Sequence, residues 1–356
     1  MQSDHQAQLS ANINSILDAL LSTPDVSPSD AAKQITTLAT DYFRTCAQPS
    51  ADPTEDTNNE NYGPCTPEIP IFFECLWGMV VRQAKSAPVE KPAQREHTTR
   101  LVELVCKIKG NRHPEGEEWF IHGQRCSWED LPLLGLEIRE SYNGPFDSPY
   151  FWKANAMLLS QEAQIAMAGA SRFQSQGSTN GDPETLSEQV AESRHSWLSL
   201  QPFICRLWSD CHCNSYAVYA IWAIRPALED WPETPPSFDA QHDNYERSPA
   251  YLALEVEVAS IWICKTAPLM YKCTEIWGPN GNPDWNINSA PGQGGRRWDG
   301  VDGYDREHKR WQLWKAVLAE VIRWCDGPGS VHMKGWKVKD AATGAMEVMN
   351  EVERME

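Results

Sequence analysis

The sequence predicts an all-α fold, a single large helical domain of about ten helices around an aromatic-rich core or cavity. Apolar residues recur at helical spacing along most of the 356 residues, and the only plausible β-hairpin is WFIHGQRCSW at 119–128. Tryptophan is also unusually frequent, with 16 residues against 9 phenylalanines and 10 tyrosines. Because tryptophan is the largest apolar side chain, these rings either fill a core or line a cavity.

The first expected elements are a pair of helices within residues 1–46. Ile13, Leu17 and Leu20 fall on one face of the stretch 11–21, and a second helical period runs from about 29 to 46. The stretch 47–67 contains four prolines and four acidic residues but no apolar period, which predicts a flexible linker.

The main helical domain is expected at 68–326. A capping box of Ser127 and Asp130 is predicted to open one of its helices, and a capping residue followed by proline opens three more, at 148–149, 182–183 and 248–249. The other predicted elements are helices at 68–86, 100–109, about 202–225 and 304–325, loops at 231–247 and 278–303, and a C-terminal tail at 327–356 with a short helix near 340–354.

The composition excludes several classes of protein. A formal net charge of -18 argues against nucleic-acid binding, which requires a basic face. The longest apolar run, AVYAIWAI at 217–224, is too short to span a membrane, and MQSDHQAQLS does not resemble a secretory signal. Eleven cysteines without regular spacing favour reduced core thiols in a cytoplasmic protein, and the oligomeric state is not predicted.

Standard catalytic motifs are mostly absent from the sequence. It contains no GxGxxG, GxxxxGK[ST], GxSxG or HExxH. Cys205 and the run Cys211-His212-Cys213 would crowd one predicted helix, so core thiols are favoured over a zinc site. Glu257 shares a helix face with Lys265, which favours an exposed surface pair.

The first candidate site is a polar stripe on the helix predicted at 202–225. Arg206, Asp210 and Asn214 are spaced i, i+4 and i+8 on an otherwise apolar and aromatic helix. The stripe is either a solvated face with one salt bridge or the wall of a site. In a site, the Asp210 and Asn214 oxygens would suit Mg²⁺ and Arg206 would suit a phosphate.

The second candidate site is the glycine-rich stretch GGRRWDGVDGYDREHKRWQLWK at 294–315. It carries Arg296, Arg297 and Arg310 together with Asp302 and Asp305. One interpretation is a solvated loop with local ion pairs. The other is a mobile lid, in which the arginines clamp a diphosphate and the carboxylates share a divalent cation.

Five stretches resemble a known family: FFECLWGMVVRQAK, WEDLPLLGLEIRESY, FWKANAMLLS, the ALE of 227–229, and REHKRWQLWKAVL. They resemble a large family of filamentous-fungal helical proteins of unknown function. The spacings W-x-x-N at 152–155 and R-W-x-x-W-K at 310–315 are its most specific parts, and the resemblance covers roughly 68–326.

Some members of that family are encoded in secondary-metabolite gene clusters, and the resemblance to them implies an activity for this chain. Through the atypical α-humulene synthases of tropolone-sesquiterpenoid pathways, the resemblance implies an Mg²⁺-dependent cyclase of farnesyl diphosphate. The chain lacks DDxxD, and Asn155 is followed by Ser160 and Glu162 at the wrong offsets for the second terpene-synthase motif. The metal and diphosphate ligands of such an enzyme would therefore lie elsewhere.

The candidate residues for this chemistry form three groups. Aromatic faces can stabilise a carbocation, and arginines can hold the leaving diphosphate. The groups are Trp208, Trp262, Trp311 and Trp314 for the pocket, Arg206, Arg296, Arg297 and Arg310 for the diphosphate, and Asp210, Asn214, Asp302 and Asp305 for Mg²⁺. The alternatives are a metal-free pericyclase or isomerase for an apolar fungal natural product, and a helical interaction protein without catalysis.

Overall fold

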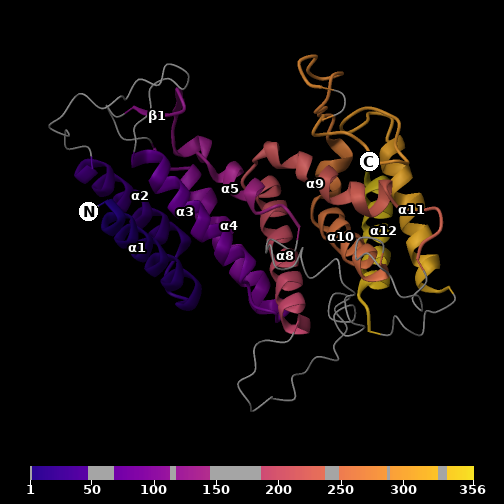
Figure 1. Cartoon of the computed structure of the whole chain (residues 1–356), viewed down its shortest axis with the longest axis horizontal. Helices are drawn as coiled ribbons and strands as arrows, with labels where there is room; N and C mark the ends of the chain where they lie inside the picture. The colour runs from indigo at the N-terminus through magenta and orange to yellow at the C-terminus, as the bar shows by residue number, and fades with distance from the viewer. Residues whose placement is uncertain are drawn as a thin grey trace, which may run out of the picture. The chain divides into compact units, whose positions relative to one another are not determined.

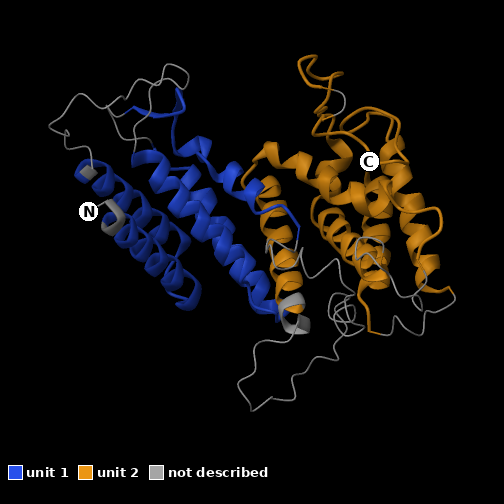
Figure 2. Cartoon of the chain, in the orientation of Figure 1, with its two compact units in different colours: residues 1–144 blue, residues 145–356 orange. Residues whose placement is uncertain are grey.

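The computed structural model of the chain describes residues 2–46, 68–112, 118–144, 186–236, 248–286, 289–327 and 335–356. Within these ranges the chain is helical apart from turns, loops and one two-stranded hairpin, so the predicted all-α class is confirmed. The chain divides into two compact units, residues 1–144 and 145–356 (Figure 2). No helix in the described part is long and apolar enough to cross a membrane.

Unit 1 contains four long helices, a hairpin and a short helix. Its elements are α1 (Gln2–Ser22), α2 (Pro28–Cys46), α3 (Glu68–Lys85), α4 (Lys91–Lys109), β1 (Trp119–Ile121), β2 (Gln124–Cys126) and α5 (Leu134–Glu140). Its core is a cluster of aromatic rings. The ring centroids of Phe43 and Trp128 each lie 5.2 Å from that of Trp119, and the Phe73 centroid lies 5.3 Å from that of Trp128. Such edge-on pairs add to the burial of apolar area, so this aromatic cluster stabilises unit 1.

The predicted hairpin and capping box of unit 1 are both present. Strands β1 and β2 pair antiparallel, and His122 and Gly123 between them have φ of 49° and 75°, as a tight hairpin turn requires. The Ser127–Asp130 box opens only a short 3-10 turn at Trp128–Asp130. The helix resumes at Leu134 because Pro132 lacks an amide hydrogen and the residues on both sides of it are left-handed.

Unit 2 is built from α8 (Leu186–Ser209), α9 (Ala217–Ile224), α10 (Pro249–Lys272), α11 (Lys309–Cys325) and α12 (Val338–Met355) (Figure 1). The π-helical turn η3 (Arg225–Glu229) continues α9. Helix α10 contacts α8, α9 and α12, and α11 packs on α12. The pairs Lys315–Glu353 and Lys339–Asp326 make α11 antiparallel to α12.

One predicted helix boundary in unit 2 is confirmed, and the predicted C-terminal helix is present. Ser248 caps α10 by accepting a hydrogen bond from the Tyr251 amide at 3.2 Å, with Pro249 at the first helical position. The C-terminal helix is present and is longer than predicted, at Val338–Met355. The other capping-residue–proline pairs, Ser148-Pro149 and Asp182-Pro183, lie outside the described residues.

Two predictions about unit 2 are wrong. The helix expected at about 202–225 is interrupted, because α8 runs through Pro202 and ends at Ser209 before a turn in which His212 has a φ of 54°. The helix expected from residue 304 begins only at Lys309, since the Asp305 carboxylate accepts hydrogen bonds from the Glu307 and Arg310 amides just before it.

The prediction of reduced cysteines is wrong for two positions. Cys106 in unit 1 and Cys211 in unit 2 are not free thiols, since each takes part in a disulfide. The thiols of Cys205 and Cys325 are buried instead, and burial raises the pKa of both, that of Cys325 to about 12. These two therefore stay protonated and unreactive at neutral pH, as the core-thiol interpretation requires.

Candidate functional site

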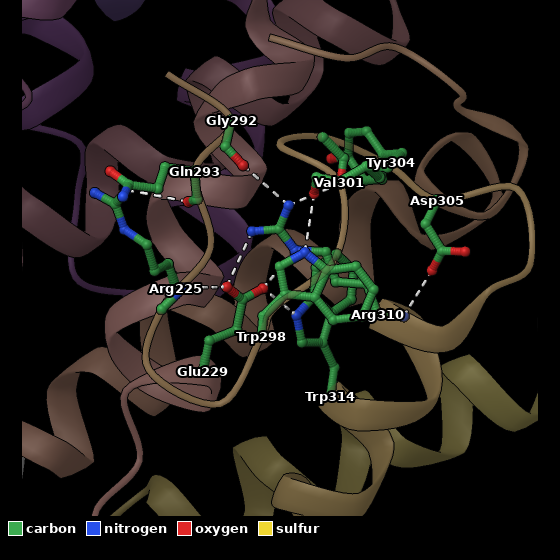
Figure 3. Close-up of polar contacts among 12 residues, drawn as sticks. Arg225, Glu229, Gly292, Gln293, Trp298, Val301, Tyr304, Asp305, Arg310 and Trp314 are labelled. Atoms are coloured by element: carbon green, nitrogen blue, oxygen red, sulfur yellow. Dashed lines mark hydrogen bonds and ion pairs between the residues drawn. The ribbon is translucent and has the colours of Figure 1, made fainter. Parts of the chain in front are cut away.

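The centre of unit 2 is a buried ion pair between Glu229, at the end of η3, and Arg310, in the first turn of α11 (Figure 3). The Arg310 side chain is 1% exposed and Glu229 is 0% exposed. The pair is bidentate, with Nε–Oε1 at 2.6 Å and Nη2–Oε2 at 2.9 Å. Two charges this deeply buried require further polar partners, because each has lost its hydration.

Those further partners are present in the same cluster. The Trp314 indole N–H donates to Oε1 of Glu229 and the Gly295 amide donates to Oε2, both at 2.8 Å. Nη1 of Arg310 donates to the carbonyls of Gly292 at 3.0 Å and Gly303 at 2.7 Å. One ion pair thus joins η3, α11 and both ends of the loop 292–303, which we call the clamped loop.

The glycines of the clamped loop allow close packing. A Cβ atom on Gly292 would lie 2.1 Å from the Asp302 carbonyl oxygen, and one on Gly295 would lie 2.7 Å from Cβ of Glu229. A Cβ on Gly294 or Gly300 would come within 2.2 Å of the Trp298 ring. Glycine is needed at these positions because the loop backbone packs directly against neighbouring atoms, where a Cβ atom would not fit. Such close packing does not support the mobile-lid interpretation.

The four predicted pocket tryptophans are all buried. Trp262 donates its N–H to Oε1 of Gln201, and Trp311 donates to Oε1 of Glu353, both at 2.9 Å. Trp314 bonds to Glu229, and Trp208 is 4% exposed beside Tyr304. In this structure the four rings therefore belong to the core.

The predicted diphosphate-binding arginines have different environments. Arg310 is occupied by Glu229 and two carbonyls, so it is not available to a ligand. Arg297 pairs with Glu320 at 2.9 Å and its side chain is 22% exposed. Arg296 donates to the Asp230 carbonyl at 2.7 Å, but 75% of its side chain is exposed. Of these three arginines, Arg296 has the greatest freedom to meet an anion.

The predicted polar stripe is only partly formed. Arg206 pairs with Asp210 at 2.7 Å, which confirms the i, i+4 contact, and Ser209 also donates to Asp210. Asn214 does not continue the stripe, because α8 ends at Ser209 and Asn214 begins the separate 3-10 turn η2 (Asn214–Tyr216). Its side chain is exposed.

Two contacts of Tyr304, one between rings and one a hydrogen bond, bring the segments that contain Asp210 and Asp302 to one region of unit 2. The Trp208 ring lies 6.4 Å from the Tyr304 ring, and the Tyr304 hydroxyl donates to the Ala217 carbonyl at 3.0 Å. The segment 210–214 follows Trp208, and Asp302 and Asp305 flank Tyr304. Within the described residues, no group of three or more His, Cys, Asp or Glu side chains is already placed to hold a metal ion.

The two aspartates near Tyr304, Asp302 and Asp305, differ in their hydrogen bonds and exposure. Asp305 accepts a hydrogen bond from the Glu307 amide on one carboxylate oxygen and from the Arg310 amide of α11 on the other, so its main role is structural. Asp302 is partly exposed, and its side chain lies over Gly278, where a Cβ atom would approach it to 2.4 Å. Asp210 and Asp302 are thus the better candidates for a ligand in this region.

Several polar residues that the structure makes prominent were not predicted as site residues. Glu257 is buried and pairs with Arg194, so the surface pair expected with Lys265 is wrong. Glu255 is 9% exposed, and burial raises its pKa to about 7. The sequence contained a signal that these two carboxylates are buried. Helix α10 is apolar around most of its circumference, so a carboxylate within it must face a neighbouring element.

Comparison with known proteins identifies a family but no activity. The family model described as "Protein of unknown function (DUF3632)" matches residues 77–318. No curated protein matches the chain, and no solved structure matches it. The expected resemblance to a family of unknown function is thus confirmed at that level.

Proposed function

The chain belongs to the DUF3632 family of proteins of unknown function, and we propose that it is an atypical sesquiterpene cyclase acting on farnesyl diphosphate with Mg²⁺. The product would be a macrocyclic hydrocarbon such as α-humulene. The observation that carries the proposal is the packing of Tyr304 against Trp208 and Ala217, which brings the segments that contain Asp210 and Asp302 into the same part of unit 2.

The available donors fit a magnesium–diphosphate ligand better than a bare metal ion. Mg²⁺ is usually held by one or two carboxylates together with substrate phosphates and water. Asp210 and Asp302 would supply the carboxylates, and the Asn214 amide oxygen a further donor. When bound, Mg²⁺ would neutralise charge on the leaving diphosphate.

The chain's own residues have defined roles in this proposal. Arg206 holds the Asp210 carboxylate, and the exposed Arg296 would attract the diphosphate. The C1–O bond of the substrate breaks, diphosphate leaves with the electron pair, the distal double bond attacks C1, and a proton is lost. Trp277 is only partly buried and lies 6.0 Å from the Tyr304 ring, so its face can stabilise the cation.

The direct test is a product assay on the purified full chain. We expect incubation with farnesyl diphosphate and Mg²⁺ to give a sesquiterpene detected by gas chromatography–mass spectrometry, and EDTA to abolish it. Asp210→Asn and Asp302→Asn should each lower turnover by about 10²-fold, as losses of single electrostatic groups do.

Asp284→Asn is the matched control, since Asp284 is an exposed aspartate in the neighbouring turn and should leave turnover unchanged. Full activity in both site variants would place the metal elsewhere. Absence of product from farnesyl, geranyl and geranylgeranyl diphosphates would contradict the cyclase proposal.

A second candidate is a helical interaction protein without catalysis. It is favoured by the hydrogen bonds that the indole N–H groups of Trp262, Trp311 and Trp314 make inside unit 2. Rings that are fully used in a core do not need a ligand. The same assay separates the two candidates, because this one predicts no turnover of any prenyl diphosphate under conditions in which the chain is folded.

A further inference from the structure

Helix α10 carries two buried polar atoms for which the described residues supply no hydrogen-bond partner. Nη2 of Arg194 on α8 donates to Oε2 of Glu257 on α10 at 2.5 Å. Among the described residues, neither the other carboxylate oxygen of Glu257, Oε1, nor the Ser260 hydroxyl has a hydrogen-bond partner. Glu257 is 7% exposed and Ser260 is 3% exposed, so bulk water does not reach these two atoms.

The two atoms belong to neighbouring positions of α10. Glu257 and Ser260 are three residues apart, and side chains at this spacing are neighbours on one helix surface, with Cβ atoms about 5–6 Å apart. The Arg194–Glu257 pair lies beside these positions.

The charges around Glu257 determine what could bind there. Arg194 pairs with this carboxylate, and Lys337 is also close enough to interact with it electrostatically. Two positive groups already balance one negative group, which disfavours a further cation. The unsatisfied oxygen of Glu257 would repel an anion. The ligand that fits is neutral, small, and able to donate one hydrogen bond while making a second.

We propose that α10 binds one internal water molecule beside the Arg194–Glu257 pair, which donates to Oε1 of Glu257 and exchanges a second hydrogen bond with Oγ of Ser260. Internal waters typically make about three such bonds to buried polar groups that would otherwise be unsatisfied. The water would stabilise the ionised Glu257–Arg194 pair and so help to hold α8 against α10. This site is separate from the acidic segments of the proposed cyclase and does not depend on that activity.

A crystal structure of the full chain at better than about 2 Å resolution tests the site directly, since ordered waters are then visible. The expected result is a peak within about 3.2 Å of both Oε1 of Glu257 and Oγ of Ser260, the range of a hydrogen bond. The proposal is overturned if no peak lies there, or if the Ser260 hydroxyl has rotated to donate directly to Glu257.

A double-mutant cycle gives an independent test in solution. With a shared water, Ser260→Ala and Glu257→Gln should be coupled, so that the double variant's unfolding equilibrium constant departs at least about 2-fold from the product of the single effects. The control cycle pairs Ser260→Ala with Glu255→Gln, which lies on another face of α10 and should combine additively. Additive effects in both cycles would overturn the proposal.

Discussion

At the scale of single residues, the buried carboxylates Glu229 and Glu255 of unit 2 differ in their partners. Glu229 has an arginine, an indole and a backbone amide on its two oxygens. Glu255 is buried on α10, where none of the described residues forms an ion pair with it, and desolvation raises its pKa. The first residue therefore stabilises the fold as a charged group, whereas burial favours the protonated form of the second.

Glu255 gives unit 2 a pH-dependent stability with a definite direction. Its carboxyl keeps its proton in the folded chain up to a pKa of about 7, whereas the reference value is 4.5. Folding therefore takes up a proton between these values, and stability falls as the pH rises from about 4.5 to about 7, by roughly 3 kcal/mol at most.

Glu255→Gln should remove this dependence and raise the free energy of unfolding at pH 8, which urea denaturation at pH 5 and pH 8 would measure. The matched control is Glu351→Gln on the exposed face of α12. If wild type and Glu255→Gln have the same pH profile, Glu255 does not titrate in this range.

At the scale of elements, the sequence predicts helices better than it predicts the loop between α10 and α11. The periodicity and capping rules located most helices, because these features depend on residues close in sequence. The role of Arg310 depends on Glu229, 81 residues away, and on carbonyls of the clamped loop. A glycine-rich loop with arginines is equally compatible with a mobile lid and a tightly packed segment, and only the tertiary contacts distinguish them.

The clamped loop should depend on its central ion pair. Arg310→Met leaves Glu229 charged and buried, and removing one partner of a buried pair costs about 3–5 kcal/mol of stability. We expect that loss in chemical denaturation, together with faster tryptic cleavage after Arg296 and Arg297.

Arg296→Met is the control for the denaturation measurement, since its exposed side chain should contribute less than about 0.5 kcal/mol. Equal stabilities of the Arg310 and Arg296 variants would contradict the structural role assigned to the pair.

At the scale of the whole molecule, the helical body predicted from the sequence consists of two compact units. The sequence marks the stretch 47–67 as a linker, yet α2 before it and α3 after it belong to the same unit and contact each other. Composition shows where a chain lacks apolar residues, but it does not show which helices pack across the gap. The same limit applies to the candidate acidic segments. The sequence shows which residues could bind a metal ion, but it does not show which side chains contact them.

Unit 1 should fold without unit 2. Its helices enclose their own core, in which Phe72, Phe73 and Trp77 are 0% exposed, and residues 1–144 are within the usual size range of a domain. We expect a fragment of residues 1–144 to give a helical circular-dichroism spectrum and one cooperative thermal transition. Phe73→Ala in this fragment should cost about 3–5 kcal/mol, as large-to-small changes in aromatic cores do, whereas Val89→Ala, at a residue that is 73% exposed, should cost little. A fragment that melts without cooperativity, or that tolerates both substitutions equally, would show that the aromatic cluster requires unit 2 to form.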